Sequence, residues 1–389
     1  WLGPYQLVDT LGEGGMGVVY LARQEQPIQR QVALKVIKPG MDSQQVIARF
    51  QVERQALALM EHAHIARVYD AGLTPSGRPY FVMEYVQGEP ITDYCDKHKL
   101  TTRARLQLFL RVCEGVQHAH RNAIIHRDIK PQNVLVTVHE SRAVPKIIDF
   151  GIAKATDQRL TEQTVFTELG QLIGTPEYMS PEQAEMSGEN IDTRTDIYSL
   201  GVLLYELLIG MLPFDSRELR KVGYDEIRRL IREVDPPRPS TRLSTLGGDS
   251  GVMADMRGTS PAKLISQLQG DLDWITLKAL EKDRTRRYGS PSEMAEDIKR
   301  HLRHEPVLAS PPSRSYRLRK FVRRHKVGVS FAAMVFLLAV TLAVTMSIQA
   351  GRVARERDRA NAQAELAAQE AETARQVSDF LVGLFKVSD

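Results

Sequence analysis

One segment restricts the fold of this chain more than any other: Val327–Ile348 contains no charged residue. As a helix it would be about 33 Å long, close to the roughly 30 Å hydrocarbon core of a bilayer. A helix buried in a protein core is the alternative, but the length of the uncharged run and the basic residues directly before it favour a membrane span. We therefore predict a transmembrane helix at 327–349.

The positive charge of the chain is concentrated beside this segment. The net charge is +4 over 389 residues, yet one strip before the segment holds seven basic residues and no acidic one: Arg314, Arg317, Arg319, Lys320, Arg323, Arg324 and Lys326. The rest of the chain therefore sums to a slightly negative charge, which argues against a nucleic-acid partner. Basic residues also follow the segment, but Glu356 and Asp358 alternate with them, so the excess predicts that the N-terminal part faces the cytoplasm.

The pattern of the first 300 residues changes from strand-like to helix-like near Gly88. Alternation predicts strands at 5–11 and 17–23, and further strands are expected at 31–37, 66–71 and 80–85. A period of 3.6 predicts one helix among them at 44–60. Beyond Gly88 the pattern predicts helices at 102–120, 196–208, 224–231, 272–280 and 292–302. We expect an α+β fold with a small β-rich lobe at 1–86, a larger helical lobe at 87–303 and a ligand cleft between them.

The remaining segments lack a clear period or lie beyond the predicted lobes. Residues 240–260, rich in Ser, Gly, Thr and Asp, are predicted to be a flexible surface insert, and prolines at 306, 311 and 312 predict a linker at 304–326. Residues 350–389 are predicted to form an exposed helix and then the start of a truncated extracytoplasmic region, because the apolar cluster 380–385 needs a partner surface. The chain begins without Met, which suggests a fragment.

Cysteine content indicates a reducing compartment for the first part of the chain. Cys95 and Cys113 are too few for a disulfide framework or a zinc site. Cys113 lies in a predicted apolar helix, so we expect a buried, reduced thiol.

Five short motifs follow one another in the first half of the chain: Gly12-x-Gly14-x-x-Gly17-x-Val19, Val32-Ala33-Leu34-Lys35, His126-Arg127-Asp128-Ile129-Lys130-Pro131-Gln132-Asn133, Asp149-Phe150-Gly151 and Ser180-Pro181-Glu182. Glycines allow backbone amides to approach phosphates closely. The glycine motif lies between two predicted strands, which excludes a dinucleotide-binding turn from strand to helix. Amide and carboxylate oxygens such as those of Asn133 and Asp149 are suited to Mg²⁺.

In this order and spacing, the five motifs resemble the signature set of protein kinases, and the resemblance covers residues 1–303. Lys130 is typical of Ser/Thr kinases rather than tyrosine kinases. The segments 270–275, 278–284 and 316–321 are similar to those of eukaryotic-like bacterial membrane kinases of the planctomycete type, in which repeats often follow the span. The resemblance implies a bilobal kinase fold, ATP and Mg²⁺ as cofactors with Mn²⁺ as an alternative ion, protein substrates, and a single-pass protein of the inner membrane.

The resemblance also implies a role for individual residues. Asp128 would be the catalytic base, Lys130 would neutralise the transferring phosphate, and Lys35 would contact the α/β-phosphates and pair with Glu53, with Glu61 as the alternative partner. Asn133 and Asp149 would bind the metal. The other expected nucleotide-binding residues are Leu11, Gly12, Glu13, Gly14, Gly15, Gly17, Val19, Ala33, Met83, Glu84, Val86 and Leu135.

Further residues are expected to regulate or support the site. Thr161, Thr164 and Thr167 are candidates for autophosphorylation, with Arg127 as the cationic partner of the phosphate. The expected structural contacts are a buried ion pair between Glu182 and Arg287, and Asp196 bracing the catalytic loop.

The sequence leaves two rival functions. A membrane-anchored pseudokinase would use the fold as a nucleotide-binding scaffold, but every catalytic position is intact. A small-molecule kinase of related fold is disfavoured by the segment 175–182, which in protein kinases shapes a groove for peptides. Homodimerisation through the span is left open, since small residues such as Ala339 and Ala343 occur there without a G-x-x-x-G motif.

Overall fold

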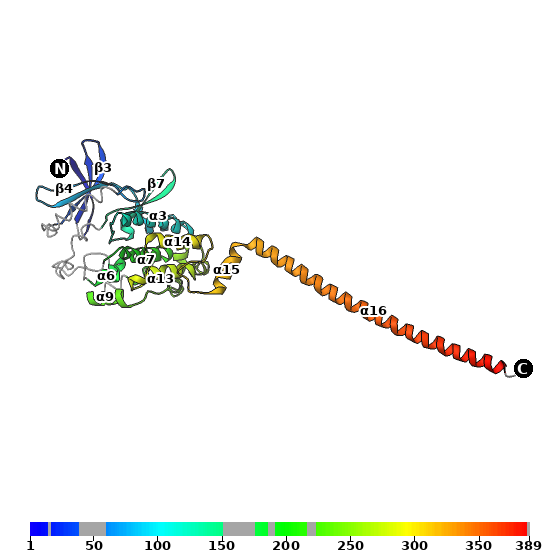
Figure 1. Cartoon of the computed structure of the whole chain (residues 1–389). Helices are drawn as coiled ribbons and strands as arrows, with labels where there is room; N and C mark the ends of the chain where they lie inside the picture. The colour runs from blue at the N-terminus through cyan, green and yellow to red at the C-terminus, as the bar shows by residue number, and fades with distance from the viewer. Residues whose placement is uncertain (15–16, 39–59, 151–175, 186–190, 216–222, 387–389) are drawn as a thin grey trace. The chain divides into compact units, whose positions relative to one another are not determined.

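The computed structural model describes residues 1–14, 17–38, 60–150, 176–185, 191–215 and 223–386 (Figure 1). It contains two compact units, Trp1–Arg317 and Leu318–Asp389.

The first unit begins with a five-stranded antiparallel sheet. Its strands are β1 (Tyr5–Gly14), β2 (Gly17–Gln24), β3 (Arg30–Ile37), β4 (Val68–Leu73) and β5 (Pro79–Glu84), in the spatial order β1-β2-β3-β5-β4. Strand β3 is central and buries successive residues from Val32 to Lys35, which is why it shows a continuous apolar run in the sequence. The predicted strands are thus confirmed with small shifts of their ends. The helix expected at 44–60 lies outside the described residues, apart from Met60.

Helices make up most of the remainder of this unit. They are α2 (Ile91–Lys97), α3 (Thr102–Arg121), α6 (Pro181–Ala184), α7 (Arg194–Ile209), α9 (Tyr224–Glu233), α13 (Asp271–Ala279) and α14 (Pro291–Leu302). Thr101 caps α3 by accepting a hydrogen bond from the amide of Ala104, and α7 ends at Gly210, whose φ of 75° lies in the left-handed region. All five helices predicted beyond Gly88 are confirmed.

A second, small sheet lies in the helical lobe and was absent from the prediction. It consists of β6 (Glu89–Pro90), β7 (Val134–His139) and β8 (Arg142–Ile147). Strands β7 and β8 form a hairpin whose turn residues Glu140 and Ser141 have φ values of 47° and 64°. Such turns usually contain Asn or Gly, and because neither occurs here, the turn could not be recognised from the sequence.

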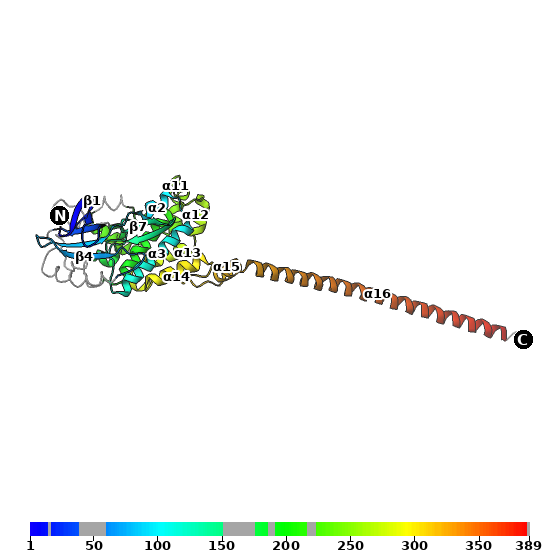
Figure 2. The ribbon, with the colours of Figure 1, turned by 90° about the horizontal axis from the view of Figure 1, so that it is seen from above.

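The prediction of a flexible insert at 240–260 is wrong. The segment contains α10 (Pro239–Ser244) and α11 (Asp249–Asp255), followed by α12 (Pro261–Leu268), and α11 and α12 lie on the same side of the lobe as α2 (Figure 2). Leu243 and Ala254 are fully buried, and the buried guanidinium of Arg257 donates hydrogen bonds to carbonyls at the end of α7. A few apolar side chains and one arginine therefore order a segment of polar composition.

The first unit extends beyond the prolines that were expected to end it. Asp297 in α14 accepts hydrogen bonds from the backbone amides of Leu308 (2.7 Å) and Ala309 (2.9 Å). The hydroxyl of Tyr316 donates to Asp271 (2.8 Å) and accepts from the amide of Val307 (3.1 Å). These contacts hold the segment after α14 against α13 and α14, so the compact unit continues to Arg317.

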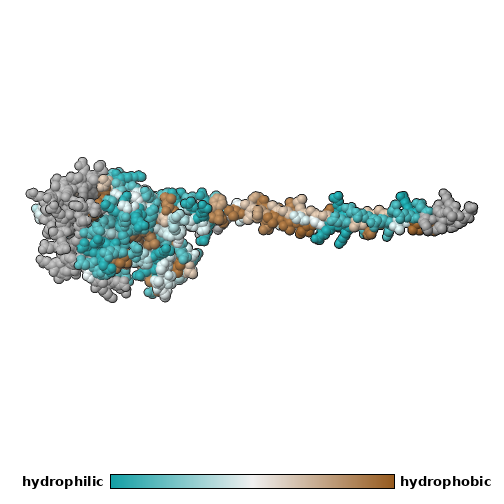
Figure 3. Space-filling model, turned by 60° about the horizontal axis from the view of Figure 1, so that its bottom comes forward, coloured by the Kyte–Doolittle hydropathy of each residue, from teal (hydrophilic) through white to brown (hydrophobic). Residues whose placement is uncertain are grey.

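Helix α15 (Arg314–Arg324) starts in the first unit and ends in the second, which otherwise consists of α16 (Lys326–Lys386). Within α16 the structure places a helix long and apolar enough to cross a membrane, beginning at Val327. Figure 3 shows apolar residues along the first part of α16 and polar residues along most of the rest. The predicted span and the predicted exposed helix are therefore parts of one continuous helix.

Candidate active site

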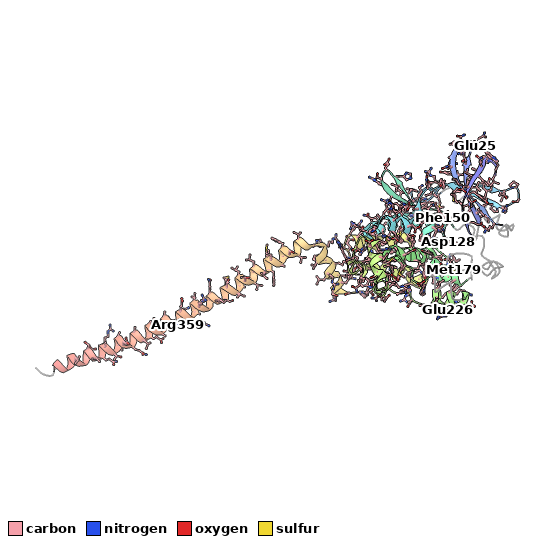
Figure 4. All side chains as sticks on the ribbon, turned by 180° about the vertical axis from the view of Figure 1, so that it is seen from behind. Glu25, Asp128, Phe150, Met179, Glu226 and Arg359 are labelled. Atoms are coloured by element: carbon pink, nitrogen blue, oxygen red, sulfur yellow. The ribbon has the colours of Figure 1, made fainter. Side chains whose placement is uncertain are left out.

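A cleft of about 740 Å³ lies between the N-terminal sheet and the helical lobe of the first unit. Asp128 lies at this junction (Figure 4). The predicted site residues that line the cleft are Leu11, Gly12, Glu13, Gly14, Gly17, Val19, Ala33, Lys35, Met83, Glu84, Val86, Asp128, Lys130, Asn133, Leu135 and Asp149. Two other predicted residues, Gly15 and Glu53, lie outside the described residues.

The register of the sheet explains how it supplies an apolar surface and one cation to the cleft. Val19 on β2 pairs with Lys35 on β3, and Ala33, two residues before Lys35, pairs with Met83 on β5. Residues directly opposite one another, and residues two apart on one strand, share a face of a sheet. The apolar side chains and the lysine therefore face the same side.

The three glycines of the first motif differ in what they contribute. A Cβ atom on Gly12 or Gly14 would meet no described atom within 4 Å. A Cβ on Gly17 would collide with the carbonyl oxygen of Val36 on the neighbouring strand. Gly17 is thus required by the packing of β2 against β3, whereas Gly12 and Gly14 leave open space along the cleft.

Lys35 and Asp149 form an ion pair that joins the two lobes. The ammonium group of Lys35 donates to Oδ1 of Asp149, and Lys35 is 8% exposed. Asp149 has a φ of 58°, in the left-handed region that residues other than glycine seldom adopt. Unusual backbone angles of this kind often occur at functional sites.

Asp128 lies at the centre of a polar network on the floor of the cleft. Its Oδ2 accepts hydrogen bonds from Nζ of Lys130 (2.9 Å) and Nδ2 of Asn133 (3.0 Å). The same Nδ2 also donates to the backbone carbonyl of Asp128 (2.8 Å), and Asn133 belongs to the short helix η1 (Pro131–Asn133). Because both bonds use the amide nitrogen, the amide oxygen of Asn133 is the atom suited to a metal.

His126 connects the backbone of both acidic residues. Its Nδ1 accepts from the amide of Asp128 (3.2 Å), so the proton is on Nε2, which donates to the carbonyl of Ile148 (3.1 Å), next to Asp149. Burial lowers the pKa of His126, which favours this neutral form. The ring also packs against that of Phe150, with centroids 4.6 Å apart, and Figure 4 labels Phe150 near Asp128.

Asp196 braces the catalytic loop, as predicted. Its carboxylate accepts hydrogen bonds from the backbone amides of His126 and Arg127, both 2.8 Å, and from His120 (2.7 Å). Burial alone would raise the pKa of Asp196, but these bonds outweigh it and hold the pKa below its usual value. Arg127 itself has a φ of 63°, so the brace holds a strained backbone.

The predicted ion pair between Glu182 and Arg287 is also confirmed. The guanidinium makes two bonds of 2.7 and 2.8 Å to the two carboxylate oxygens, and the Arg287 side chain is fully buried. Thr195 donates a further hydrogen bond to Glu182 (2.7 Å). These contacts fix α6 to the loop before α14. The threonines proposed for autophosphorylation, and Thr175, lie outside the described residues.

At the back of the cleft, part of the backbone that connects the two lobes is hydrogen-bonded to the sheet. The amide of Glu84 donates to the carbonyl of Arg67 (2.8 Å), and the Glu84 carboxylate pairs with Lys146 (2.7 Å). An adenine ring would therefore meet the carbonyl of Glu84 rather than its amide. Further lining residues were not predicted: Tyr85, Gln87, Gly88, Gln132 and Ile148. Gln132 lies inside a recognised motif and could have been identified from it.

The residues of the cleft fit a magnesium ion that is shared with phosphates. Asn133 and Asp149 supply hard oxygen donors to the same space. In the part of the chain that the structure describes, no group of three or more His, Cys, Asp or Glu side chains could hold a metal. Mg²⁺ is commonly held by one or two protein ligands together with phosphates and water, so two donors suffice.

Comparisons with known proteins agree with this geometry. The protein kinase domain family matches residues 5–302. The serine/threonine-protein kinase PknB of Mycobacterium tuberculosis is 36% identical over 310 residues, which cover 78% of this chain and 44% of PknB. The serine/threonine-protein kinase Pkn1 of Myxococcus xanthus is 33% identical over 290 residues, covering 74% of this chain and 37% of Pkn1. This chain therefore spans less than half the length of these relatives.

A solved structure supports the fold. The crystal structure of the PknI kinase domain of M. tuberculosis has a TM-score of 0.54 and 24% sequence identity, and the match covers 77% of this chain and 97% of that one. At this identity the likeness concerns the fold alone. It covers a sheet lobe, a helical lobe and the cleft between them.

Proposed function

This chain belongs to the protein kinase family, and we propose that it transfers the γ-phosphoryl group of ATP to Ser and Thr hydroxyls of proteins. The observation that carries the proposal is the convergence of Lys35, Asp128, Asn133 and Asp149 in one cleft between the lobes. The relatives PknB and Pkn1, both serine/threonine-protein kinases, support the choice of acceptor. Retention of these residues favours catalysis over a nucleotide-binding scaffold.

Phosphoryl transfer requires the protein chiefly to position the reacting groups and to neutralise the charge of the phosphates. Asp128 would accept the proton of the substrate hydroxyl and orient its oxygen, while the bonds from Lys130 and Asn133 hold the carboxylate in place. Lys130 would then lie beside the transferring phosphoryl group and offset its negative charge. Lys35 would bind the α- and β-phosphates, with its position fixed by the contact with Asp149.

The nucleotide would be held by both lobes. Val19, Ala33 and Leu135 would contact the adenine ring, with Met83 as gatekeeper, and the carbonyl of Glu84 would accept from it. Asn133 and Asp149 would hold Mg²⁺, or Mn²⁺ in its place, which when bound neutralises phosphate charge. Glu53 remains the proposed helical partner of Lys35.

The proposal extends to the whole protein as a single-pass receptor kinase of the inner membrane. The apolar part of α16 would cross the bilayer, and the basic strip before it supports a cytoplasmic position for the catalytic unit. Autophosphorylation at Thr161, Thr164 or Thr167 would regulate the catalytic unit. The segments 270–275, 278–284 and 316–321 support a planctomycete-type kinase.

The test is a transfer assay on the full chain in detergent with labelled ATP and a generic acceptor protein. Asp128→Asn should lower kcat by about 10² to 10⁴, because the carboxylate is the proposed base, while nucleotide binding is retained. Lys35→Met should weaken transfer by about 10² to 10³, because a phosphate-binding cation is lost. Lys97→Met, in an exposed ion pair with Glu89, is the matched control and should leave transfer unchanged. Wild-type rates in Asp128→Asn would contradict the proposal.

A further inference from the structure

Helix α15 has two sides of different character, and one of them is held by the first unit. Tyr316, near the start of the helix, donates to Asp271 (2.8 Å), and its ring meets that of Trp274 edge-on with centroids 5.2 Å apart. Asp271 and Trp274 both belong to α13. This side of α15 is therefore fixed by specific contacts.

The opposite side of α15 is apolar and exposed. At about 100° per residue, Leu318, Phe321 and Val322 fall within an arc of about 100°, on the side of the helix away from Tyr316. Their exposed fractions are 63%, 56% and 40%. Scattered apolar side chains are normal on a protein surface, but a contiguous patch indicates a contact surface.

Basic residues flank this apolar face. On the helical wheel, Arg317 and Arg324 lie along one edge and Arg319 along the other, while Arg314 lies within the arc one turn before Leu318. No acidic residue occurs between Arg314 and Lys326. An apolar face bordered by arginine and lysine is the pattern of a helix that lies in the headgroup region of a membrane.

The position of α15 in the chain identifies its partner. The helix ends at Arg324, and the apolar part of α16 begins at Val327. When that part crosses a bilayer, the last turn of α15 must lie at the level of the lipid headgroups, whatever the orientation of the rest of the molecule. An acidic protein could also complement the charge, but the bilayer is already adjacent.

We propose that α15 is an interfacial helix that binds anionic phospholipids of the leaflet entered by the span. Leu318, Phe321 and Val322 insert at the boundary between headgroups and acyl chains, and the flanking basic side chains bind the lipid phosphates. This inference rests on the membrane anchoring in the proposed function. The same helix begins within the first unit, where Tyr316 donates to Asp271 of α13.

The test uses the full chain in nanodiscs of phosphatidylcholine alone or mixed with phosphatidylglycerol. A polarity-sensitive fluorophore is attached at Val322→Cys, and at Leu338→Cys within the span; the native Cys95 and Cys113 are buried. In anionic discs, we expect the emission of the Val322 probe to shift to shorter wavelength and its fluorescence to be quenched by spin-labelled lipid. Most of this response should be lost in neutral discs. It should also be lost in about 1 M salt, because the Debye length is then near 3 Å. The Leu338 probe should be quenched in both kinds of disc.

Matched charge variants complete the design. Arg319→Gln with Arg324→Gln should abolish most of the anionic response of the Val322 probe. Arg352→Gln with Arg355→Gln removes the same charge on the other side of the span and should leave the response unchanged. Both variants should retain wild-type kinase rates in detergent.

Three results would overturn the inference, and they are distinguishable. An unresponsive Val322 probe beside a quenched Leu338 probe would refute lipid binding by α15 and leave the membrane span intact. An unquenched Leu338 probe would refute the span and the inference together. A response of Val322 only to an added acidic protein would assign α15 to a protein partner instead.

Discussion

His126 is a positioning residue whose ring holds the backbone of both acidic residues of the cleft. We expect His126→Phe to lower kcat by about 10², because the amide of Asp128 and the carbonyl of Ile148 lose their partners and the carboxylates shift. Nucleotide affinity, measured separately, should change far less. The control is His98→Phe at an exposed position, which should keep wild-type kcat. An unchanged kcat in His126→Phe would show that the ring is dispensable.

The same residue predicts a pH dependence of stability. Unfolded histidine has a pKa of about 6.5, and burial lowers the pKa of His126 in the folded protein. Below pH 6.5 the unfolded chain binds a proton that the folded protein does not, so the free energy of unfolding falls with falling pH until the folded pKa is reached. The slope is about 1.4 kcal/mol per pH unit for one such group.

This contribution must be separated from those of other buried groups. Burial also lowers the pKa of His62 and His64. Burial raises the pKa of Glu206 to about 7, so between pH 4.5 and 7 this group makes the free energy of unfolding rise as the pH falls, opposite to the histidines. We therefore expect the wild-type curve, followed by Trp274 fluorescence in denaturant, to be steeper below pH 6.5 than that of His126→Phe. Parallel curves would refute a buried neutral imidazole.

For single residues, the sequence predicted which residues form the site better than it predicted the contacts that those residues make. The spacing of Asp128, Asn133 and Asp149 within recognised motifs predicted residues that the structure brings together. It could not show that Gly17 is required by the carbonyl of Val36 on a neighbouring strand, because that contact depends on the register of β2 and β3. Nor could it assign the tautomer of His126, which depends on two backbone groups far apart in the chain.

Among the elements of the helical lobe, α6 depends on one buried ion pair. Arg287→Ala should lower the free energy of unfolding by about 3 to 5 kcal/mol, because it leaves the carboxylate of Glu182 buried without its partner. Arg284→Ala removes a half-exposed arginine 3.5 Å from Asp192 and should cost less than about 1 kcal/mol. Calorimetry of the two variants in detergent provides the measurement. Equal losses would contradict the assigned importance of the pair.

A double variant separates charge from packing at this contact. Arg287→Met with Glu182→Leu should recover much of the stability lost in Arg287→Ala, since an apolar pair needs no buried partner charge. If the double variant is as unstable as the single one, the hydrogen bonds of Arg287 to the carbonyls of Arg194 and Glu281 are the dominant contribution.

Periodicity predicted the long helices, but it did not predict short elements that are stabilised by a few contacts with residues far away in the sequence. Helices α3 and α7 show clear apolar patterns and were predicted within two residues at each end. Helices α10 and α11 are short and polar. Arginine is usually solvent-exposed, yet Arg257 joins α11 to the end of α7 through backbone carbonyls. The hairpin of β7 and β8 was missed because its turn lacks glycine and asparagine.

At the scale of the whole molecule, composition located the boundary of the units only approximately. Prolines at 306, 311 and 312 suggested an exit near 303, yet Asp297 and Asp271 hold the chain through Tyr316. Proline ends a helix, but it does not prevent an extended segment from packing on one. Composition did separate the apolar and polar parts of α16, although it could not show that the helix continues without a break.

The last prediction concerns the orientation of the span. Seven basic residues precede it without an acidic one, whereas Arg352, Arg355, Arg357 and Arg359 follow it with Glu356 and Asp358 between them. The side with more arginine and lysine is retained in the cytoplasm, so the cleft would face cytoplasmic ATP. In a bacterial host, alkaline phosphatase fused after residue 389 should be active, and green fluorescent protein fused at the same position should not fluoresce, because residue 389 lies beyond the span. Unequal basic flanks thus predict one orientation, and a fluorescent protein with an inactive phosphatase after residue 389 would show that the catalytic unit cannot meet cytoplasmic ATP.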